Sequence, residues 1–418
     1  MTDKLNIIVA GGGITGVSTA EWLRRDGHDV TIIDRIASGE SGQTSYGNAG
    51  ILARCAVVPV PTPGVWMKAP KMLFDPDGPL FMRWSYLPKL LPWLIPYLRS
   101  GRRDRVEAIA RALLPLVDDT LEQHQALARG TPAERWITTG EYSYFYPDRA
   151  AFRDDGFGFA LRKTHGFEWE ERDRDKLLEI DPNIGPAYSF AATFKGYGWI
   201  TDPGRYVADL AAWFAGQGGH LRQGEISEIL PLDDGRAAVV VDGERIEADR
   251  VVIATGAWSA SLARALGHEP ALESERGYHL WLRGPSIVPP HPYMLADAKF
   301  LATPMEAGLR CAGLVEFGGL DAPASKAPVG LFKRRIRKLY PTLTWESEDA
   351  WMGHRPSTID SLPLIGPSPK APGVVFAFGA QHLGLTMGPK TGRLIADLIG
   401  DRSPNIDMTP YNVGRFDN

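Results

Sequence analysis

Residues 5–34, LNIIVAGGGITGVSTAEWLRRDGHDVTIID, decide the fold. Residues 5–10 are apolar and rich in β-branched side chains, which predicts a buried parallel strand. A glycine-rich turn then leads into an amphipathic helix that Gly27 is expected to end. Residues 30–33 predict a second strand, which finishes at Asp34. The chain therefore opens with a complete strand–helix–strand unit.

Three glycines of this turn, Gly11, Gly13 and Gly16, have the G-x-G-x-x-G spacing of a dinucleotide-binding loop. The first allows a tight turn, the second lets the backbone approach a pyrophosphate, and the third lets helix and strand pack closely. Asp34, 18 residues after Gly16, stands where a carboxylate accepts hydrogen bonds from ribose hydroxyls and disfavours NADP. The alternative is a purely structural glycine turn. The pattern predicts a nucleotide site and leaves NAD and FAD open.

Length and composition set the class of protein. With 418 residues, 44% of them hydrophobic, the chain is long enough for two globular domains. Its net charge of −4 leaves no basic footprint, so we expect no nucleic-acid partner. We also expect no membrane-spanning helix, because no apolar run reaches about 18 residues. Two cysteines, Cys55 and Cys311, argue against a disulfide framework and favour the cytoplasm, and no His, Asp and Glu spacing predicts a metal site.

Later segments return to the same α/β pattern. Residues 251–254 and 374–378 predict buried strands, and residues 385–399 predict a long helix. Residues 206–217 predict another helix, and residues 237–248 predict a hairpin around an Asp-Gly turn. These pieces predict an α/β domain assembled from separate parts of the chain.

The intervening segments predict a second domain. Residues 136–146 alternate like a strand of another sheet, and residues 102–129 predict a helix with a kink at Pro115. The polar stretch 35–50 is too long for a simple turn and is therefore expected to be functional. The second domain is expected to fill two insertions.

Four blocks beyond the opening unit carry a family pattern. They are SGQTSYGNAGI (41–51), ATGAWS (254–259), MGHRPSTIDSLPLIG (352–366) and FGAQHLGLT (378–386). In order and extent they resemble the FAD-dependent D-amino-acid dehydrogenases and the wider D-amino-acid oxidase/glycine oxidase superfamily. The resemblance implies FAD as the cofactor, because an NAD-dependent dehydrogenase would leave the later blocks without a role.

The same resemblance implies the fold and its division. We expect an α/β protein with a Rossmann-type FAD-binding domain and a second, α+β substrate domain built on a mixed or antiparallel sheet. The FAD-binding domain is expected to be discontinuous, with residues 1–56, 202–274 and 353–418, and the substrate domain to contain residues 57–201 and 275–352.

The resemblance further implies which residues hold FAD. The loop 44–51 would lie against the flavin and ribityl chain, residue 226 would contact the adenine, and the turn 255–256 would pack against the phosphates. The start of the last helix would point at the flavin N1/O2 edge, where its positive dipole end stabilises negative charge. The implied set is Gly11, Gly13, Ile14, Thr15, Gly16, Asp34, Arg35, Thr44, Ser45, Asn48, Ala49, Gly50, Ile51, Ile226, Thr255, Gly256, Trp258, Gly353, His382, Leu383, Gly384, Leu385 and Thr386.

FAD is expected to be bound noncovalently. Some relatives attach the flavin through a His in the early loop or a Cys near the C-terminus. Residues 44–50 contain no His, and Cys311 stands in a different context.

An amino-acid oxidising site also needs a cation for the substrate carboxylate. By resemblance Arg355 is that cation; the alternative is a structural arginine paired with an acid such as Asp360. Tyr278 matches a tyrosine that borders the substrate, with an ordinary core role as its alternative. His354 is the third expected catalytic residue, because a histidine can orient or deprotonate the amine; the same applies to His279 and His382, each with a structural role as its alternative.

The function implied is dehydrogenation of D-amino acids, with hydride transfer from Cα to flavin N5 and release of an imino acid. Aromatic residues near the pocket favour D-proline or cis-4-hydroxy-D-proline as a variant. One alternative is a glycine/sarcosine oxidase-like enzyme, another a flavoprotein acting on 2-hydroxy acids, and a third a non-catalytic FAD-binding subunit of a larger complex.

Residues 79–101 leave two interpretations open. Their Trp and Leu residues are interleaved with Arg83, Lys89 and Arg99, which would suit a membrane surface and a quinone as electron acceptor. The favoured interpretation is a proline-broken lid or wall of the substrate domain. We therefore expect a cytoplasmic protein, with peripheral contact at the inner membrane as the less favoured alternative.

Overall fold

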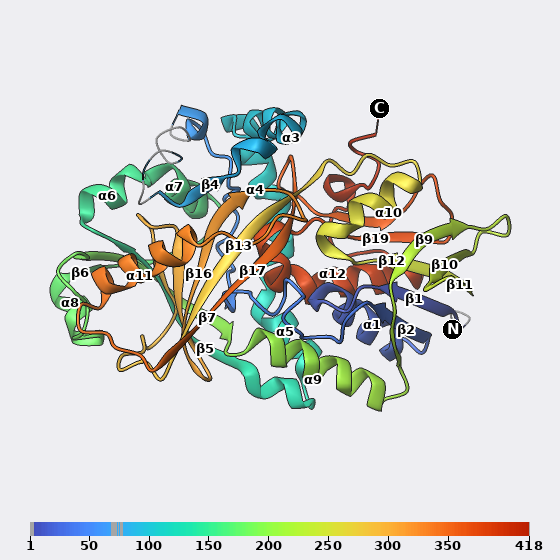
Figure 1. The fold of residues 1–418 in the computed structure, drawn as a ribbon, viewed down its shortest axis with the longest axis horizontal. Helices are drawn as coiled ribbons and strands as arrows, with labels where there is room; N and C mark the ends of the chain where they lie inside the picture. The colour runs from blue at the N-terminus through green and yellow to red at the C-terminus, as the bar shows by residue number, and fades with distance from the viewer. Residues whose placement is uncertain (1–3, 68–72, 74, 76–77, 418) are drawn as a thin grey trace.

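Two large β-sheets lie towards opposite ends of the molecule's long axis (Figure 1). The structure is a computed structural model that describes residues 4–67, 73, 75 and 78–417. One sheet is mostly parallel and contains the opening unit of the chain. The other is mixed and contains the segments expected in the substrate domain.

The mostly parallel sheet is built around the first strand. β1 pairs in parallel with β2 on one side and with β12 on the other. These strands are buried on both faces, which explains their continuous apolar runs. The sheet order is β18-β19-β12-β1-β2-β8, with β18 antiparallel to β19 at one edge. The strands are β1 (Asn6–Ala10), β2 (Asp29–Asp34), β8 (His220–Gln223), β12 (Arg250–Ile253), β18 (Leu364–Pro367) and β19 (Val374–Phe378).

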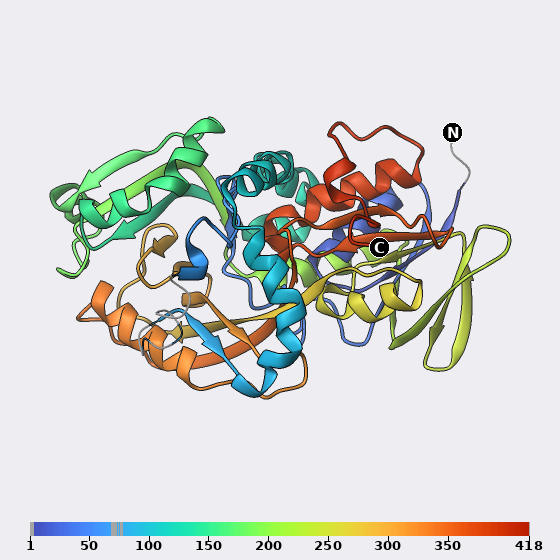
Figure 2. The ribbon, with the colours of Figure 1, turned by 90° about the horizontal axis from the view of Figure 1, so that it is seen from above.

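Different layers cover the two faces of this sheet. Helices α1, α9 and α12 share one core cluster with it, and α10 and a three-stranded antiparallel sheet share the other. The small sheet reaches the end of the molecule (Figure 2). Helix α9 starts earlier than predicted because the Asp202 side chain caps it, accepting from Arg205 N at 3.1 Å. The elements are α1 (Ile14–Arg25), α9 (Pro203–Gly216), α10 (Ser259–Ala265), α12 (Gly384–Ile399), β9 (Ile226–Pro231), β10 (Ala237–Val241) and β11 (Glu244–Ala248).

The mixed sheet follows the order β17-β13-β16-β15-β14-β5-β7-β3, with β4 beside β16 and β6 beside β7. The strand predicted over 136–146 is β5, and it pairs antiparallel with β7 along its whole length. The strands are β3 (Ile51–Leu52), β4 (Leu80–Met82), β5 (Ile137–Tyr146), β6 (Glu170–Asp173), β7 (Phe190–Ile200), β13 (Leu272–Arg283), β14 (Tyr293–Leu295), β15 (Phe300–Met305), β16 (Gly308–Phe317) and β17 (Ser347–Thr358).

The helix predicted over 102–129 is wrong in one respect, because the segment forms two helices. Helix α4 continues past Pro115 and ends at Val117, and α5 begins at Thr120. Pro115 lies in the last turn of α4, where the missing N–H removes one helical bond and the helix ends soon afterwards. The break turns α5 onto α12.

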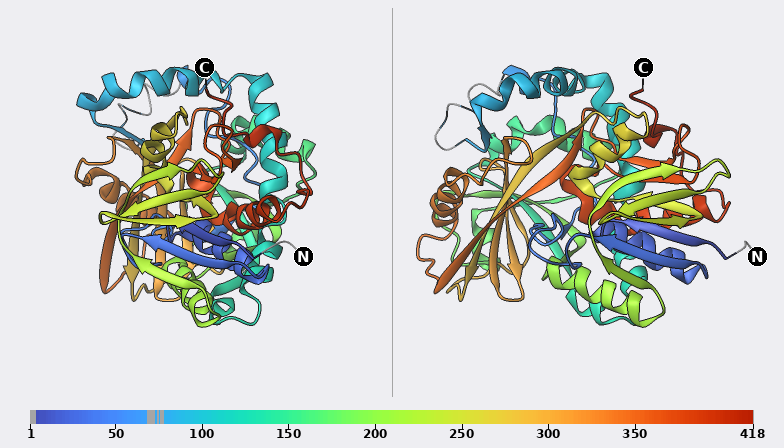
Figure 3. Two further views of the ribbon diagram at one scale, coloured as in Figure 1. Left: turned by 90° about the vertical axis from the view of Figure 1, so that its right-hand side faces the viewer. Right: turned by 45° about the vertical axis from the view of Figure 1, so that its right-hand side comes forward.

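The remaining helices divide between the two halves of the molecule, with α4 and α5 packed on α12. Helix α3, light blue in Figure 3, contacts β13, and α11 contacts β13 and β16. They are α3 (Leu87–Arg99), α4 (Arg103–Val117), α5 (Thr120–Ala128), α6 (Arg149–Asp154), α7 (Gly156–Thr164), α8 (Arg174–Ile180) and α11 (Ala327–Leu339), with short 3₁₀ turns at Trp84–Tyr86, Pro132–Trp136, Gly256–Trp258, Gln381–Leu383 and Thr409–Tyr411.

The predicted domain boundaries at 274/275 and 352/353 lie inside two long strands. β13 and β17 pair with each other over twelve residues, from Leu272 opposite Thr358 to Arg283 opposite Ser347. Both strands belong to the mixed sheet, and Ser357 near the end of β17 forms an isolated bridge to Ala380, just after β19 of the parallel sheet. The two strands therefore connect the two halves of the molecule directly.

Candidate active site

A cavity of about 950 Å³ lies between the two sheets. One end is lined by the glycine-rich turn and by residues at the carboxyl ends of β1, β2 and β12, and the other by residues of β13, β16 and β17. The carboxyl edge of a parallel sheet is where α/β folds bind ligands. The volume is near the upper end of the range for ligand pockets, so it suits a long ligand with a smaller molecule beside it.

The glycine-rich turn brings bare backbone to the cavity. Gly11 has φ +108°, and a Cβ there would lie 2.5 Å from the Ala254 carbonyl oxygen. A Cβ on Gly16 would lie 1.9 Å from the Gly11 oxygen. The Ile14 N–H at the start of α1 donates to Ser45 Oγ at 3.0 Å. Only glycine fits at the first and third motif positions, and α1 points its N-terminal end at the cavity.

Asp34 is held in place by its neighbours at the end of β2. Its Oδ2 accepts from Gly12 N at 2.7 Å and from Gln43 Nε2 at 3.0 Å, and its Oδ1 accepts from Ile36 N at 3.2 Å. A carboxylate has further lone pairs on both oxygens. Because Asp34 also lines the cavity, it can accept bonds from a ribose as well.

Next to Asp34, the side chains of Arg35 and Trp258 form a flat, partly cationic surface. The Arg35 guanidinium carbon lies 4.1 Å from the centre of the Trp258 ring, which is a cation–π contact. Both residues line the cavity together with Ile226 of β9. Such a surface suits a planar aromatic base.

The loop expected to hold the flavin is fixed by a residue that sequence reasoning missed. Arg310 of β16 donates through Nη1 to the carbonyl oxygens of Tyr46, at 3.0 Å, and Asn48, at 2.7 Å. Its side chain is fully buried, which lowers its pKa to about 10. Asn48 in turn accepts from Gly50 N at 2.9 Å. Arg310 fixes the backbone of the loop. The sequence alone could not reveal this role, because more than 250 residues separate Arg310 from the loop.

The start of α12 is the second helix end at the cavity. Gly384, Leu385 and Thr386 line it, and no side chain caps the helix. The first N–H groups of a helix have no partner within the helix and carry the positive end of its dipole. This end can therefore receive acceptor atoms of a ligand. His382 lies just before it, and burial lowers the pKa of its imidazole to about 4, so it is neutral at pH 7.

Most of the expected FAD residues line this cavity. The exceptions are Gly16, whose role is close packing of α1 on the turn, and Gly50, whose carbonyl accepts from Ile200 N at 2.8 Å. The residues that line it are Gly11, Gly13, Ile14, Thr15, Asp34, Arg35, Thr44, Ser45, Asn48, Ala49, Ile51, Ile226, Thr255, Gly256, Trp258, Gly353, His382, Leu383, Gly384, Leu385 and Thr386.

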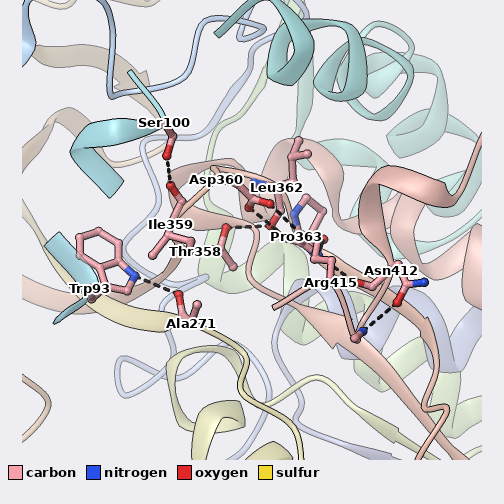
Figure 4. A network of polar contacts seen from close by, with 11 residues as sticks. Trp93, Ser100, Ala271, Thr358, Ile359, Asp360, Leu362, Pro363, Asn412 and Arg415 are labelled. Carbon is pink, nitrogen blue, oxygen red and sulfur yellow. Dashed lines mark hydrogen bonds and ion pairs between the residues drawn. The ribbon is translucent and has the colours of Figure 1, made fainter. Parts of the chain in front are cut away.

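Arg355 forms part of the wall at the other end of the cavity. Its Nη1 donates to Leu314 O at 2.8 Å and its Nη2 to Gly313 O at 3.0 Å. Asp360, the acid named as its alternative partner, instead pairs with Arg415 at 2.7 Å (Figure 4). Burial lowers the pKa of Arg355. Among the described residues it has hydrogen-bond partners but no ion-pair partner within 4.0 Å.

A buried carboxylate stands beside Arg355. Glu275 lies directly opposite it in the register of β13 and β17, and it also lines the cavity. Its Oε1 accepts from Tyr97 Oη at 3.1 Å and its Oε2 from Ser357 Oγ at 2.8 Å. The sequence did not point to Glu275 or Tyr97 as site residues, because 178 residues separate them and neither lies in one of the family blocks described above.

Tyr278 lines the cavity, but its hydroxyl is engaged elsewhere. It donates to Glu316 Oε2 at 2.6 Å and accepts from Ser325 N at 2.9 Å. Burial is the main cause that raises its pKa to about 12. The tyrosine ring can border a ligand, whereas the hydroxyl stabilises the wall.

His354 points to the opposite face of β17 from Arg355. Its Nδ1 lies 2.8 Å from Ser274 Oγ, its ring packs edge-on to Trp258, and its side chain is not among the described groups that line the cavity. Strand alternation explains this for His354, since neighbouring residues face opposite sides. His279 has the same parity as Glu275 in β13, but its ring stacks on Trp351 and its Nδ1 lies 3.1 Å from Gly47 O.

Helix α3 closes the cavity on one side. Leu94, Tyr97 and Leu98 line it. The Trp93 indole N–H donates to Ala271 O at 2.9 Å, and the Ser100 hydroxyl donates to Ile359 O (Figure 4). These contacts tie α3 to the strands that carry Glu275 and Arg355. Three large apolar side chains within residues 79–101 are exposed: Trp84, Leu91 and Ile95.

Neither a metal site nor a spanning helix is found in the described part of the chain. There, no three His, Cys, Asp or Glu side chains are grouped so that they could hold a metal ion. The described helices are all too short or too polar to cross a membrane.

Comparison with known proteins decides the family. Residues 6–398 match the DAO family of FAD-dependent oxidoreductases. The chain belongs to this family. The expected superfamily, fold class and cofactor are thereby confirmed.

The D-amino-acid oxidase of Bradyrhizobium diazoefficiens is 37% identical over 421 residues, with both chains fully covered. D-amino acid dehydrogenase 2 of Ralstonia nicotianae is 30% identical over 434 residues, covering 98% of this chain and all of the other. The structure of glycine oxidase from Geobacillus kaustophilus superposes with a TM-score of 0.73 at 21% identity, with both chains fully covered.

The cavity of this FAD-dependent oxidoreductase fits its cofactor. The clashes of a Cβ at Gly11 and Gly16 fit the tight turn and the close helix packing of a dinucleotide-binding loop, and Gly13 at its second position lines the cavity. Asp34 and the surface of Arg35 and Trp258 suit a ribose and an adenine. The uncapped start of α12 offers N–H groups to the polar edge of an isoalloxazine ring.

Proposed function

We propose that the protein oxidises D-amino acids at Cα. The observation that carries the proposal is Arg355, a partly buried cation without an ion-pair partner within 4.0 Å among the described residues, in the same cavity as the FAD-binding elements. A guanidinium fork is the side chain best suited to a planar carboxylate. The names of the two relatives, D-amino-acid oxidase and D-amino acid dehydrogenase, support the same substrate class.

The residues of the chain bind and orient the substrate. Arg355 would hold the carboxylate, while the ring of Tyr278 and the apolar parts of α3 border the side chain. The amine must lose its proton to solvent before the hydride leaves Cα. The charge of Arg355 favours that loss, and the carboxylate of Glu275, which also lines the cavity, opposes it. Bound FAD supplies the acceptor for the hydride from Cα, and the imino acid is released and, for a primary amine, hydrolysed to a 2-oxo acid and ammonia.

FAD would be held without a covalent bond. The thiol of Cys311 is buried in the core of the mixed sheet and does not line the cavity. Burial raises its pKa, which makes it a poor nucleophile. His382 lines the cavity, but it belongs to the block before α12 and not to the early loop.

The finer substrate preference is for a compact ring, D-proline or cis-4-hydroxy-D-proline. Tyr97, Tyr142, Tyr144 and Phe317 all line the cavity. Aromatic walls favour small cyclic side chains over charged ones. A second candidate is a glycine- or sarcosine-oxidising enzyme, supported by the fold shared with glycine oxidase.

A steady-state assay with an artificial electron acceptor ranks these candidates. The panel contains D-proline, cis-4-hydroxy-D-proline, D-alanine, glycine, sarcosine and a 2-hydroxy acid. Turnover is followed for all of them by reduction of the acceptor, and ammonia is measured in addition for the primary amines. The proposal predicts the largest kcat/KM for one of the D-amino acids. Turnover of glycine or sarcosine alone would favour the second candidate, and no turnover of any amine would favour a non-catalytic FAD-binding subunit.

The electron acceptor and the location are also proposals. We infer that α3 is a wall of the cavity in a cytoplasmic enzyme, because Leu94, Tyr97 and Leu98 face the cavity. A quinone at the inner membrane is the alternative, favoured by the exposed Trp84, Leu91 and Ile95. Sedimentation with anionic liposomes separates the two: a protein that stays in the supernatant agrees with the wall, and one that sediments with the vesicles contradicts it.

A further inference from the structure

Pro389 interrupts the hydrogen-bond ladder of α12 close to its start. Proline has no N–H, so the carbonyl four residues earlier, that of Leu385, loses the donor that a regular helix supplies. Leu385 lines the cavity in the turn whose N–H groups face it. The helix end at the cofactor site is therefore the part that the proline weakens.

His124 of α5 supplies the missing donor. Its Nε2 lies 2.8 Å from Leu385 O, and its Nδ1 lies 2.7 Å from Tyr206 Oη. A carbonyl oxygen can only accept, so Nε2 carries the proton and Nδ1 accepts from the Tyr206 hydroxyl. The ring is fully buried, and burial lowers its pKa to about 4, so it is neutral at pH 7. The structure thus determines a single tautomer for His124.

Neighbouring side chains hold the same part of α12. Thr120 Oγ1 donates to Thr386 O at 2.7 Å, and Asp119 Oδ2 pairs with Lys390 Nζ at 2.8 Å. All three contacts come from the first turns of α5, which the break after α4 turns onto α12. Thr386 also reaches the flavin loop, since its Oγ1 donates to Ile51 O at 3.4 Å.

We propose that His124 is a positioning residue for FAD. It does not reach the cavity, and it acts by completing the helix whose first N–H groups receive the cofactor. Pro389 creates the need for it, the Leu385 carbonyl fixes its tautomer, and the Tyr206 hydroxyl satisfies the other ring nitrogen. This inference rests on the FAD site described above and is independent of which amino acid is oxidised, so it stands or falls separately from the proposed substrate.

FAD titration of the apoprotein at pH 7 tests the proposal. His124→Phe keeps an aromatic ring and removes the donor to Leu385 O, and we expect the Kd of FAD to rise about tenfold. Tyr206→Phe is the matched control, because it leaves one buried hydrogen-bond partner unsatisfied but preserves the bond to Leu385. Its Kd should rise no more than about twofold. Equal effects of the two variants would overturn the proposal, since burial alone would then explain them.

Two further variants keep the test decisive if His124→Phe folds poorly. His124→Gln places an amide N–H near the position of Nε2 and should restore the FAD Kd to within about threefold of the wild type. In a Pro389→Ala background the backbone N–H returns, so the additional effect of His124→Phe on Kd should fall to about threefold or less. An undiminished effect in that background, or no rescue by glutamine, contradicts the proposal. A wild-type protein that binds no FAD would instead overturn the cofactor site itself.

Discussion

At the scale of single residues, Arg355 is the side chain on which the proposed substrate depends. Two of its N–H groups donate to the carbonyls of Gly313 and Leu314, which fixes the guanidinium in the cavity wall. Arg355→Lys keeps a positive charge but loses the planar fork. We expect the KM for the amino acid to rise at least about tenfold, while the FAD content stays that of the wild type. An unchanged KM would show that another group binds the carboxylate.

Gly16 gives a residue-scale test of the nucleotide site. A Cβ there would lie 1.9 Å from the Gly11 oxygen, so Gly16→Ala must displace the turn. We expect a loss of about 2–4 kcal/mol in the free energy of unfolding, together with loss of bound FAD. Gly216→Ala in α9 is the control, because nothing lies within 4 Å of its added Cβ, and it should be neutral or stabilising. Thermal unfolding and the flavin absorbance of the purified variants measure both. Retention of FAD by Gly16→Ala would contradict the assignment.

Which residues could be predicted from sequence follows from how local their roles are. Gly11, Gly16 and Asp34 act within a single strand–helix–strand unit, whose spacing is visible in the sequence. Arg310 and Glu275 act through partners from distant segments, the loop at Tyr46 and Asn48 and Tyr97 of α3, which only tertiary packing brings to the mixed sheet. The orientation of His354 also depends on the strand: its neighbour Arg355 takes the cavity face of β17, and strand alternation turns His354 away.

At the scale of elements, α3 couples the cavity wall to Glu275. The Tyr97 hydroxyl is one of two described side-chain donors to this buried carboxylate. Tyr97→Phe leaves Glu275 Oε1 without that donor, and we expect a loss of about 1–3 kcal/mol in the free energy of unfolding. Denaturant unfolding measures it. Because Tyr97 also lines the cavity, the KM for the substrate should change as well, whereas an unaltered KM and stability would contradict the coupling.

The pairing of β5 with β14 gives an expectation for acid stability. His291, beside β14, lies 2.8 Å from Ser143 Oγ of β5, and burial is the main cause that lowers its pKa from 6.5 to about 4. Glu141 and Asp181 oppose this shift and Arg172 adds to it. The unfolded state thus binds the proton more readily, so stability is intact above about pH 6.5 and falls as the pH drops towards 4.

His291→Gln tests this expectation, because glutamine keeps a hydrogen-bonding group but does not titrate. The wild type should lose up to roughly 3 kcal/mol more than the variant between pH 7.5 and pH 4. Denaturant unfolding at several pH values measures the difference. Identical pH dependence of the two proteins would show that the buried imidazole is not what destabilises the fold in acid.

Some helices and strands could be predicted from the local sequence, whereas the bounds of others depend on tertiary contacts. The strands and helices around the glycine-rich turn could be predicted because their apolar runs are continuous and their ends are marked by Gly, Asp or Pro. The separation of α4 from α5 could not, since the continuous helical pattern hides the break after Val117. The direction of α5 depends on its contacts with α12, and such tertiary contacts are not visible in a local sequence pattern.

At the scale of the whole molecule, two sheets from interleaved segments enclose one long cavity (Figure 1). One end carries the glycine-rich turn and the other carries Arg355, with β13 and β17 paired along the cavity. The interleaving was visible in the sequence because the α/β pattern returns near residues 251 and 374. The lengths of β13 and β17 were not, so the expected boundaries fell inside them.

The central claim is that a D-amino acid in this cavity reduces FAD. The most direct test is anaerobic mixing of the purified flavoprotein with the D- and L-enantiomers of one amino acid, followed through the flavin absorbance. The account predicts bleaching by the D-enantiomer and none by the L-enantiomer. A flavin that dithionite bleaches but neither enantiomer does, or one that the L-enantiomer bleaches equally well, would contradict it.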